Sequence, residues 1–148
     1  MKRLVMSVVF QVLMAGQIFG QDSDAVVVKK NTVYVHGGIF NYNGGYERSL
    51  ITLKSGVINA KAAVGKSNAP DHYGKNLMLA AGYLHGKKSH HLDADMGIGY
   101  FSNNTGDFSE FFLVGHLGYR YQKPGGLLVI KVGSGAPEGL YLGLGLAF

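Results

Sequence analysis

The chain contains no cysteine and only three prolines among its 148 residues. Without cysteine it has no disulfide framework, no thiolate metal site and no lipid-modified N-terminal cysteine. Its basic residues form no run longer than two, although the formal charge is +5. Nucleic-acid binding usually requires clustered lysine and arginine together with a recognisable motif. Because neither is present, the sequence predicts no nucleic-acid partner.

The N-terminal segment has the order of a secretory signal peptide. Lys2 and Arg3 precede an apolar stretch from Leu4 to Phe19, and polar residues follow from Gln21. A basic head, a short apolar middle and a small-residue exit are typical of a cleaved export signal. The stretch is too short and too interrupted for a membrane-spanning helix, and a buried amphipathic helix is the alternative. The expected divisions are a signal peptide over residues 1–20 (cleavage between 16 and 25), a short extension over 21–30 and a barrel over 31–148.

Glycine is abundant, with 23 residues, and the last nine positions show how it is distributed. Large apolar residues occupy alternate positions from Leu140 to Phe148, and Gly143 and Gly145 lie between them. Side chains alternate between the two faces of a strand, so one face of this segment is apolar and the other is nearly bare. Such a strand suits a barrel whose apolar face meets lipid. We expect it to close the barrel by pairing with the first strand near Val33.

Alternation of this kind recurs in eight segments separated by turn residues. The expected strands cover residues 32–40, 46–54, 57–66, 75–85, 91–101, 108–122, 127–133 and 140–148. The predicted fold is therefore all-β, an eight-stranded antiparallel up-and-down transmembrane β-barrel preceded by a signal peptide. The Asn43-Gly44 pair predicts the first hairpin turn. The first, third, fifth and seventh connections are expected to be longer and more polar than the others.

The two faces of the predicted strands differ in polarity. In residues 91–101 and 108–122, one face carries large apolar residues, whereas the other carries charged residues or glycine. A water-soluble calyx has the reverse arrangement, with an apolar interior and a charged exterior. We therefore expect the apolar face to meet lipid and the charged residues to form a polar network in the lumen. The residues expected in this network are Lys61, Asp93, Asp95, His116, Arg120 and Lys131.

Asp93 and Asp95 share a face and have two interpretations. Two carboxylates at this spacing are able to bind a metal ion or act as a catalytic pair. The interior of an eight-stranded barrel is only wide enough for side chains, however, and buried charges there need partners. Ion pairs with lysine or arginine are the preferred interpretation. For His85, His90 and His91, which flank one turn, we expect a solvated rim rather than a transition-metal site.

Three segments resemble a widespread and mostly uncharacterised family of small bacterial outer-membrane β-barrels. They are Asn43-Gly-Gly-Tyr-Glu-Arg48, Gly82-Tyr-Leu-His-Gly-Lys-Lys-Ser-His-His-Leu-Asp93 and Gly118-Tyr-Arg-Tyr-Gln-Lys-Pro-Gly-Gly126. The resemblance covers residues 31–148 and implies a location in the outer membrane of a Gram-negative cell. It also implies that the barrel-assembly machinery reads a terminal aromatic residue. Leu144, Leu146 and Phe148 would supply that signal.

The leading functional hypothesis is a non-enzymatic outer-membrane barrel with a structural or surface-interaction role. We expect a monomer whose partners are outer-membrane lipids and which has no cofactor, metal or catalytic residue. One alternative is a small, porin-like pore or a solute-binding barrel. A further alternative is a lipid-modifying enzyme that uses polar residues such as Asp71, His72 and Ser109. The chain contains no Gly-x-Ser-x-Gly nucleophile motif to support that alternative.

Overall fold

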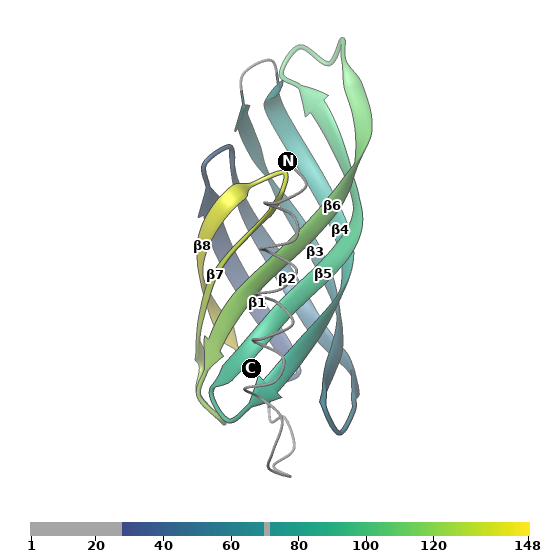
Figure 1. Ribbon diagram of the computed structural model, residues 1–148. Coiled ribbons are helices and arrows are strands. Elements are labelled where there is room, and N and C mark those ends of the chain that lie inside the picture. Colours follow the sequence, from purple (N-terminus) through teal and green to yellow (C-terminus); the bar gives the residue numbers. More distant parts are fainter. Residues whose placement is uncertain (1–27, 70–71) are drawn as a thin grey trace, which may run out of the picture.

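The computed structural model of the chain describes residues 28–69 and 72–148. These residues form a closed antiparallel barrel with its strands in sequence order (Figure 1). The strands are β1 (Asn31–Gly38), β2 (Asn41–Thr52), β3 (Gly56–Ala69), β4 (His72–Lys87), β5 (His90–Asn103), β6 (Ser109–Gln122), β7 (Leu128–Ala136) and β8 (Gly139–Ala147). The predicted all-β class, strand number and up-and-down order are confirmed. The signal peptide expected over residues 1–20 lies outside the described residues, as does most of the extension over 21–30.

Pairing of β8 with β1 closes the barrel. Val33 lies opposite Leu146 in this pair. The backbone N–H of Asn31 donates to the carbonyl oxygen of Phe148 at 3.0 Å, and the N–H of Phe148 donates to the carbonyl oxygen of Asn31 at 2.8 Å. The predicted pairing of the closing strand with the first strand near Val33 is therefore confirmed.

The wall of the barrel is not of uniform height. Asn31 and Phe148 lie at one end, here called the terminal end, and the β1–β2, β3–β4, β5–β6 and β7–β8 connections lie at the opposite, distal end. β3 to β6 contain 14 to 16 residues each, whereas β1, β7 and β8 contain 8 or 9. Figure 1 shows β3 to β6 rising above the tips of the β1–β2 and β7–β8 hairpins. One side of the distal end is consequently open.

The first hairpin turn lies earlier in the chain than the sequence predicts. Ile39 and Phe40 form the β1–β2 connection, whereas Asn43 and the two glycines after it lie within β2. Gly45 lies opposite Tyr34 in the β1–β2 pair. A Cβ added to Gly45 would lie 2.5 Å from Cζ of Tyr34, so the absence of a side chain makes room for this ring. The prediction of a turn at Asn43-Gly44 is therefore wrong. Gly45 lies within a strand, where its lack of a side chain leaves space in the lumen for the ring of Tyr34.

The predicted alternation of long and short connections is wrong for the first, sixth and seventh connections. The β1–β2 and β7–β8 connections contain two residues each, whereas the β6–β7 connection at the terminal end contains five, residues 123–127. The reason is that strand pairing continues through polar segments that read as loops. β3 and β4, for example, remain paired as far as Ala69 opposite His72.

The β6–β7 connection contains a turn that the sequence does predict. The N–H of Gly126 donates to the carbonyl oxygen of Lys123 at 2.8 Å. Pro124 precedes Gly125, whose φ is 70°. Proline followed by a residue with positive φ is the arrangement of a type II turn.

Among residues 28–69 and 72–148, no helix is long and apolar enough to cross a membrane.

The barrel is apolar outside and charged inside. On β6, the outward-facing side chains of Phe111 and Leu113 are 76% and 80% exposed. Glu47 and Arg120 point into the lumen and are each only 1% exposed. Apolar side chains do contribute to the interior, in two small clusters on either side of the charged residues. These clusters comprise Val57 and Leu84 toward the terminal end, and Ala63, Met78 and Val114 toward the distal end.

Candidate functional site

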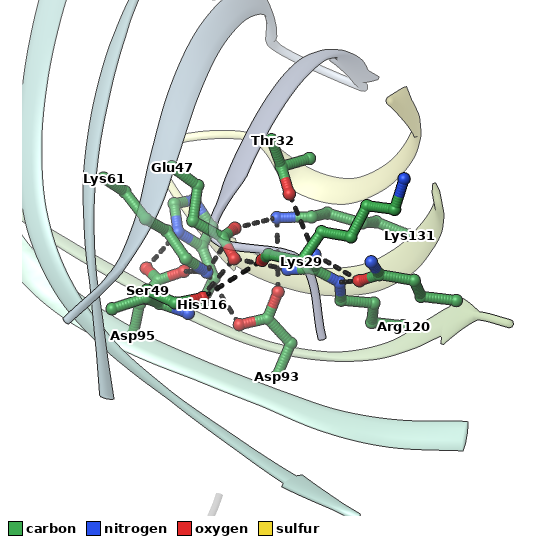
Figure 2. Close-up of polar contacts among 12 residues, drawn as sticks. Lys29, Thr32, Glu47, Ser49, Lys61, Asp93, Asp95, His116, Arg120 and Lys131 are labelled. Atoms are coloured by element: carbon green, nitrogen blue, oxygen red, sulfur yellow. Dashed lines mark hydrogen bonds and ion pairs between the residues drawn. The ribbon is translucent and has the colours of Figure 1, made fainter. Parts of the chain in front are cut away.

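The carboxylate of Glu47, on β2, is the point at which cations from three other strands converge (Figure 2). Nζ of Lys131 donates to Oε2 at 2.7 Å, and Nη1 of Arg120 donates to Oε1. Nζ of Lys61 lies 4.0 Å from Oε2. Nδ2 of Asn59 also donates to Oε1, at 3.2 Å. One carboxylate therefore connects β2 and β3 to β6 and β7 across the lumen.

Lys61, on β3, holds the two aspartates of β5. Its Nζ donates to Oδ1 of Asp93 at 2.7 Å and to Oδ2 of Asp95 at 2.7 Å. Nζ of Lys131 lies 3.3 Å from the other oxygen of Asp93. Both aspartates thus have cationic partners, as Figure 2 shows. This arrangement favours ion pairing over the alternative of a free catalytic or metal-binding pair.

Arg120 has a hydrogen-bond acceptor for each of its three nitrogen atoms. Besides the bond from Nη1 to Glu47, Nε and Nη2 both donate to Oε1 of Gln122, at 3.1 and 2.6 Å. Nη2 also donates to Oγ1 of Thr32 at 3.1 Å. A buried guanidinium requires this degree of saturation, because a buried charge without hydrogen-bond partners is strongly unfavourable.

His116, on β6, lies between two carboxylates. Its Nδ1 is 2.6 Å from Oδ1 of Asp95, and its Nε2 is 2.5 Å from Oε2 of Glu138. An ionised carboxylate only accepts hydrogen bonds, so both ring nitrogens donate and the ring is an imidazolium. Glu138 also accepts from Nδ2 of Asn43 at 2.6 Å and lies 3.3 Å from Nε2 of His36.

Glu138 lies on the β7–β8 connection, outside the strands, yet its side chain is buried in the lumen. Burial acts to raise the pKa of this carboxyl group. The hydrogen bonds and charges of His116 and His36 act in the opposite direction and lower the pKa to about 2. The short β7–β8 hairpin is therefore held to β6 by an ionised carboxylate.

The charges of the network balance. Its four carboxylates are Glu47, Asp93, Asp95 and Glu138, and its four cations are Lys61, His116, Arg120 and Lys131. The adjoining cavity measures only about 30 Å³. A water molecule needs roughly 10–15 Å³ by this kind of measure, so the cavity has room for about two. Side chains therefore fill the cross-section of the lumen at this level.

The three histidines near the β4–β5 connection do not share one environment. His91 is buried, and neither of its ring nitrogens has a hydrogen-bond partner. The solvated rim expected for it is wrong, because the alternation of β5 places His91 on the same face as Asp93. His90 is exposed and contacts the hydroxyl of Tyr119. Within residues 28–69 and 72–148, no group of three or more histidine, aspartate or glutamate side chains is placed to hold a metal ion.

All six residues that the sequence suggests for the lumen face the interior, and each contacts at least one other charged member of the network. Sequence reasoning missed Glu47 and Glu138. One signal was present: the suggested set holds only two carboxylates against three permanent cations, which implies a missing anion. Glu47 lies in a segment where both faces include apolar residues, and Glu138 lies in a predicted loop. The sequence around neither residue indicates that its side chain faces the interior.

The remaining residues of interest lie elsewhere on the barrel. Leu144, Leu146 and Phe148 are on the outer face near the terminal end, each more than half exposed. Ser109 is exposed at the distal start of β6. Asp71 and the side chain of His72 lie outside the described part of the chain. In comparisons with protein-family models, curated proteins and solved structures, nothing matches this chain.

Proposed function

We propose that the chain is an integral outer-membrane β-barrel with a closed lumen, and that it has a structural or surface-interaction role without catalysis. The observation that carries this proposal is the reversed polarity of the barrel. Charged side chains fill the interior, while large apolar side chains cover the outside. Apolar residues exposed on the outer face include Val35, Leu79, Met96, Ile98, Leu113, Leu142 and Leu144.

Such a surface is unfavourable in water. Burying apolar area stabilises a protein by about 25 cal/mol per Å², and soluble monomers rarely expose contiguous apolar patches larger than a few hundred Å². Here the apolar residues belong to neighbouring strands around the barrel, among them β1, β4, β5, β6 and β8. A lipid bilayer supplies the missing apolar neighbour. A closed barrel suits that environment, because pairing of each strand with its neighbours satisfies the backbone polar groups around most of the wall.

The closed lumen distinguishes this proposal from the porin-like alternative. The network of Glu47, Lys61, Asp93, Arg120 and Lys131 crosses the interior, and removing one partner of a buried ion pair is strongly unfavourable. We expect no steady conductance when the folded chain is reconstituted in a planar bilayer. Regular open-channel steps at moderate voltage would favour the pore instead.

Membrane fractionation combined with gel mobility tests the location. We expect the chain in the outer-membrane fraction, extracted only by detergent, with a folded band that shifts to a different mobility after boiling. The heat-dependent shift reports a folded barrel, and the fractionation reports its surroundings. A monomer that remains in solution without detergent would overturn the proposal.

The lipid-modifying alternative has its own test. Alanine at Asp71, His72 and Ser109 together should leave envelope lipid composition unchanged. A change in acylation or head-group chemistry in that variant, with the barrel still folded, would replace the structural role by an enzymatic one.

A further inference from the structure

The distal end of the barrel contains a cavity of about 240 Å³, separate from the small cavity beside the charge network. One side is polar and is formed by Asn41, Ser67 and Asn76, from β2, β3 and β4. The rest of the lining is mostly apolar and includes Phe101 and Phe112, from β5 and β6, and Phe101 is the cross-strand neighbour of Asn76. A mostly apolar chamber with a few polar groups on one side is the usual form of a small-molecule site.

This cavity reaches the outer surface through a gap in the wall. β6 pairs with β7 only from Gly115, opposite Ala136, toward the terminal end. β6 extends beyond its pairing with β7 over residues 109–114, a length of roughly 20 Å at about 3.4 Å per residue. Phe112 points inward and Leu113 points outward, yet both line the cavity. A cavity that opens sideways beside this part of β6 accounts for this.

The polar side of the cavity contains hydrogen-bonding groups without partners. Asn76 is 5% exposed, and neither its Oδ1 nor its Nδ2 has a hydrogen-bond partner among the described residues. Asn41 is 2% exposed, and its Oδ1 has none. Buried amides are normally hydrogen-bonded, and an unpaired one is destabilising. Two such amides on one side of one cavity indicate a site that a polar ligand group completes.

We propose that this cavity binds a neutral amphiphile with a single hydrocarbon chain. Its hydroxyl or amide head would bond to Asn41 and Asn76, and its chain would leave through the gap beside Phe112 and Leu113. The inference rests on the proposed membrane location, because the bilayer is the source of the ligand and the gap opens through the apolar outer face.

The chemistry of the head group follows from the residues around it. Asn76 offers both a donor and an acceptor, and a hydroxyl or amide group matches both. Among the described residues that line the cavity there is no lysine or arginine, which disfavours an anionic head. The volume of the cavity limits the number of hydrocarbon chains in the ligand. An engineered apolar cavity of about 150 Å³ holds one benzene molecule, so about 240 Å³ has room for a head group and a short run of methylenes but not for two chains.

Photolabelling of the full chain in phosphatidylcholine vesicles tests this assignment. The probe is dodecanol with a diazirine in its chain, and folding is first verified by the heat-modifiable band. We expect saturable labelling at Phe101 and Phe112. Unlabelled dodecanol should compete, whereas dodecane and ionised dodecanoate should not.

A double variant, Asn41→Leu with Asn76→Leu, tests the role of the amides. We expect its apparent affinity for the alcohol to fall by about tenfold, the effect of losing one or two hydrogen bonds. Asn68→Leu is the matched control, because Asn68 is on β3 but exposed on the outside of the barrel. Its labelling should equal that of the unmodified chain.

Two results would overturn the inference while leaving the membrane proposal intact. One is labelling of an inserted barrel that is not saturable and is confined to outward residues away from the cavity, such as Leu142. The other is equal competition by alkane and alcohol, which would show that the head group is not recognised. Failure of the unmodified chain to insert at all would overturn both proposals, and the mobility assay detects that case separately.

Discussion

Nε2 of His116 lies 2.5 Å from Oε2 of Glu138, although His116 belongs to β6 and Glu138 belongs to the β7–β8 connection. β6 is one of the tall strands and the β7–β8 hairpin is one of the short ones. The contact therefore joins the short β7–β8 hairpin to the longer strand β6, close to the point where the pairing of β6 with β7 ends. The contact is strong only while the carboxylate of Glu138 is ionised. Lowering the pH therefore tests how much this contact contributes to the stability of the barrel.

Glu138→Gln should destabilise the barrel at neutral pH but not in strong acid. The pKa of Glu138 is lowered from 4.5 to about 2 in the folded chain, so its ionised form contributes stability above about pH 4.5. That contribution is lost as the pH falls toward 2. A shift of this size corresponds to about 3 kcal/mol. Urea unfolding of the original chain and the variant, at a series of pH values in micelles, measures the difference.

Asp107→Asn is the control for this series, because Asp107 is exposed on the β5–β6 connection. Its difference from the original chain should stay small throughout. A constant penalty for Glu138→Gln down to pH 2 would contradict the electrostatic explanation and indicate a steric one.

Glu47→Gln should be the most destabilising single change in the charge network. It removes the common partner of Arg120 and Lys131 and leaves the buried network with one excess positive charge, because Asp93 remains as the only carboxylate partner of Lys131 among the described residues. Breaking a buried ion pair in this way typically costs about 3–5 kcal/mol. The free energy of unfolding in micelles measures the effect.

A second substitution, Lys131→Met in the Glu47→Gln background, should recover part of the lost stability, because it removes the excess positive charge. Lys75→Met is its control, since Lys75 is exposed. Simple additivity of the Glu47 and Lys131 effects would show that these two residues are not coupled.

Gly45→Ala should be destabilising where Gly37→Ala is not. A Cβ at position 45 would lie 2.8 Å from the carbonyl oxygen of Ala62 as well as against the ring of Tyr34. A Cβ at position 37 would meet nothing within 4 Å. Overpacking of an interior typically costs about 1–3 kcal/mol. Equal stability of the two variants in urea titrations would show that the lumen around Tyr34 is not tightly packed.

Leu142→Arg tests whether lipid surrounds the barrel. Leu142 lies within β8 and is exposed on the outer face. Arginine near the midplane of a membrane barrel costs about 2–4 kcal/mol, and close to the interface only about 0–1 kcal/mol. We expect the larger penalty for Leu142→Arg in vesicles and the smaller one for Leu53→Arg on the β2–β3 connection. A barrel surrounded by water would tolerate both substitutions equally.

The fold was largely predictable because alternation is a local property. From Leu140 to Ala147 the sequence alone separates an apolar face from a bare one, and the same holds in β5 and β6. The register in which two strands pair, by contrast, depends on residues of both strands and is not visible in either one alone. The Asn43-Gly44 pair has the composition of a turn, and only the position of the Tyr34 ring on the neighbouring strand shows why glycine follows there.

The interior network was partly predictable for the same reason. Asp93 and Asp95 lie on the face of their strand opposite the large apolar residues, and this alternation assigns them to the interior. Because buried carboxylates need compensating charge, the sequence also indicates that they have cationic partners. Glu138 could not be assigned to the interior, because its side chain enters the lumen from a connection whose height depends on the lengths of β7 and β8. Those lengths depend in turn on how far β6 and β7 remain paired.

The charge network also has a consequence for the order of assembly. Arg120 and Glu47 are 73 positions apart in the chain, and Asn43 and Glu138 are 95 apart. Contacts this distant in sequence form late and slow the folding of a chain. Lys131 and Glu138 come from the final hairpin, so in a chain emerging N-terminus first Glu47 lacks its Lys131 partner and His116 lacks its Glu138 partner until the last two strands arrive. The network of ion pairs is therefore completed only when β7 and β8 close the wall.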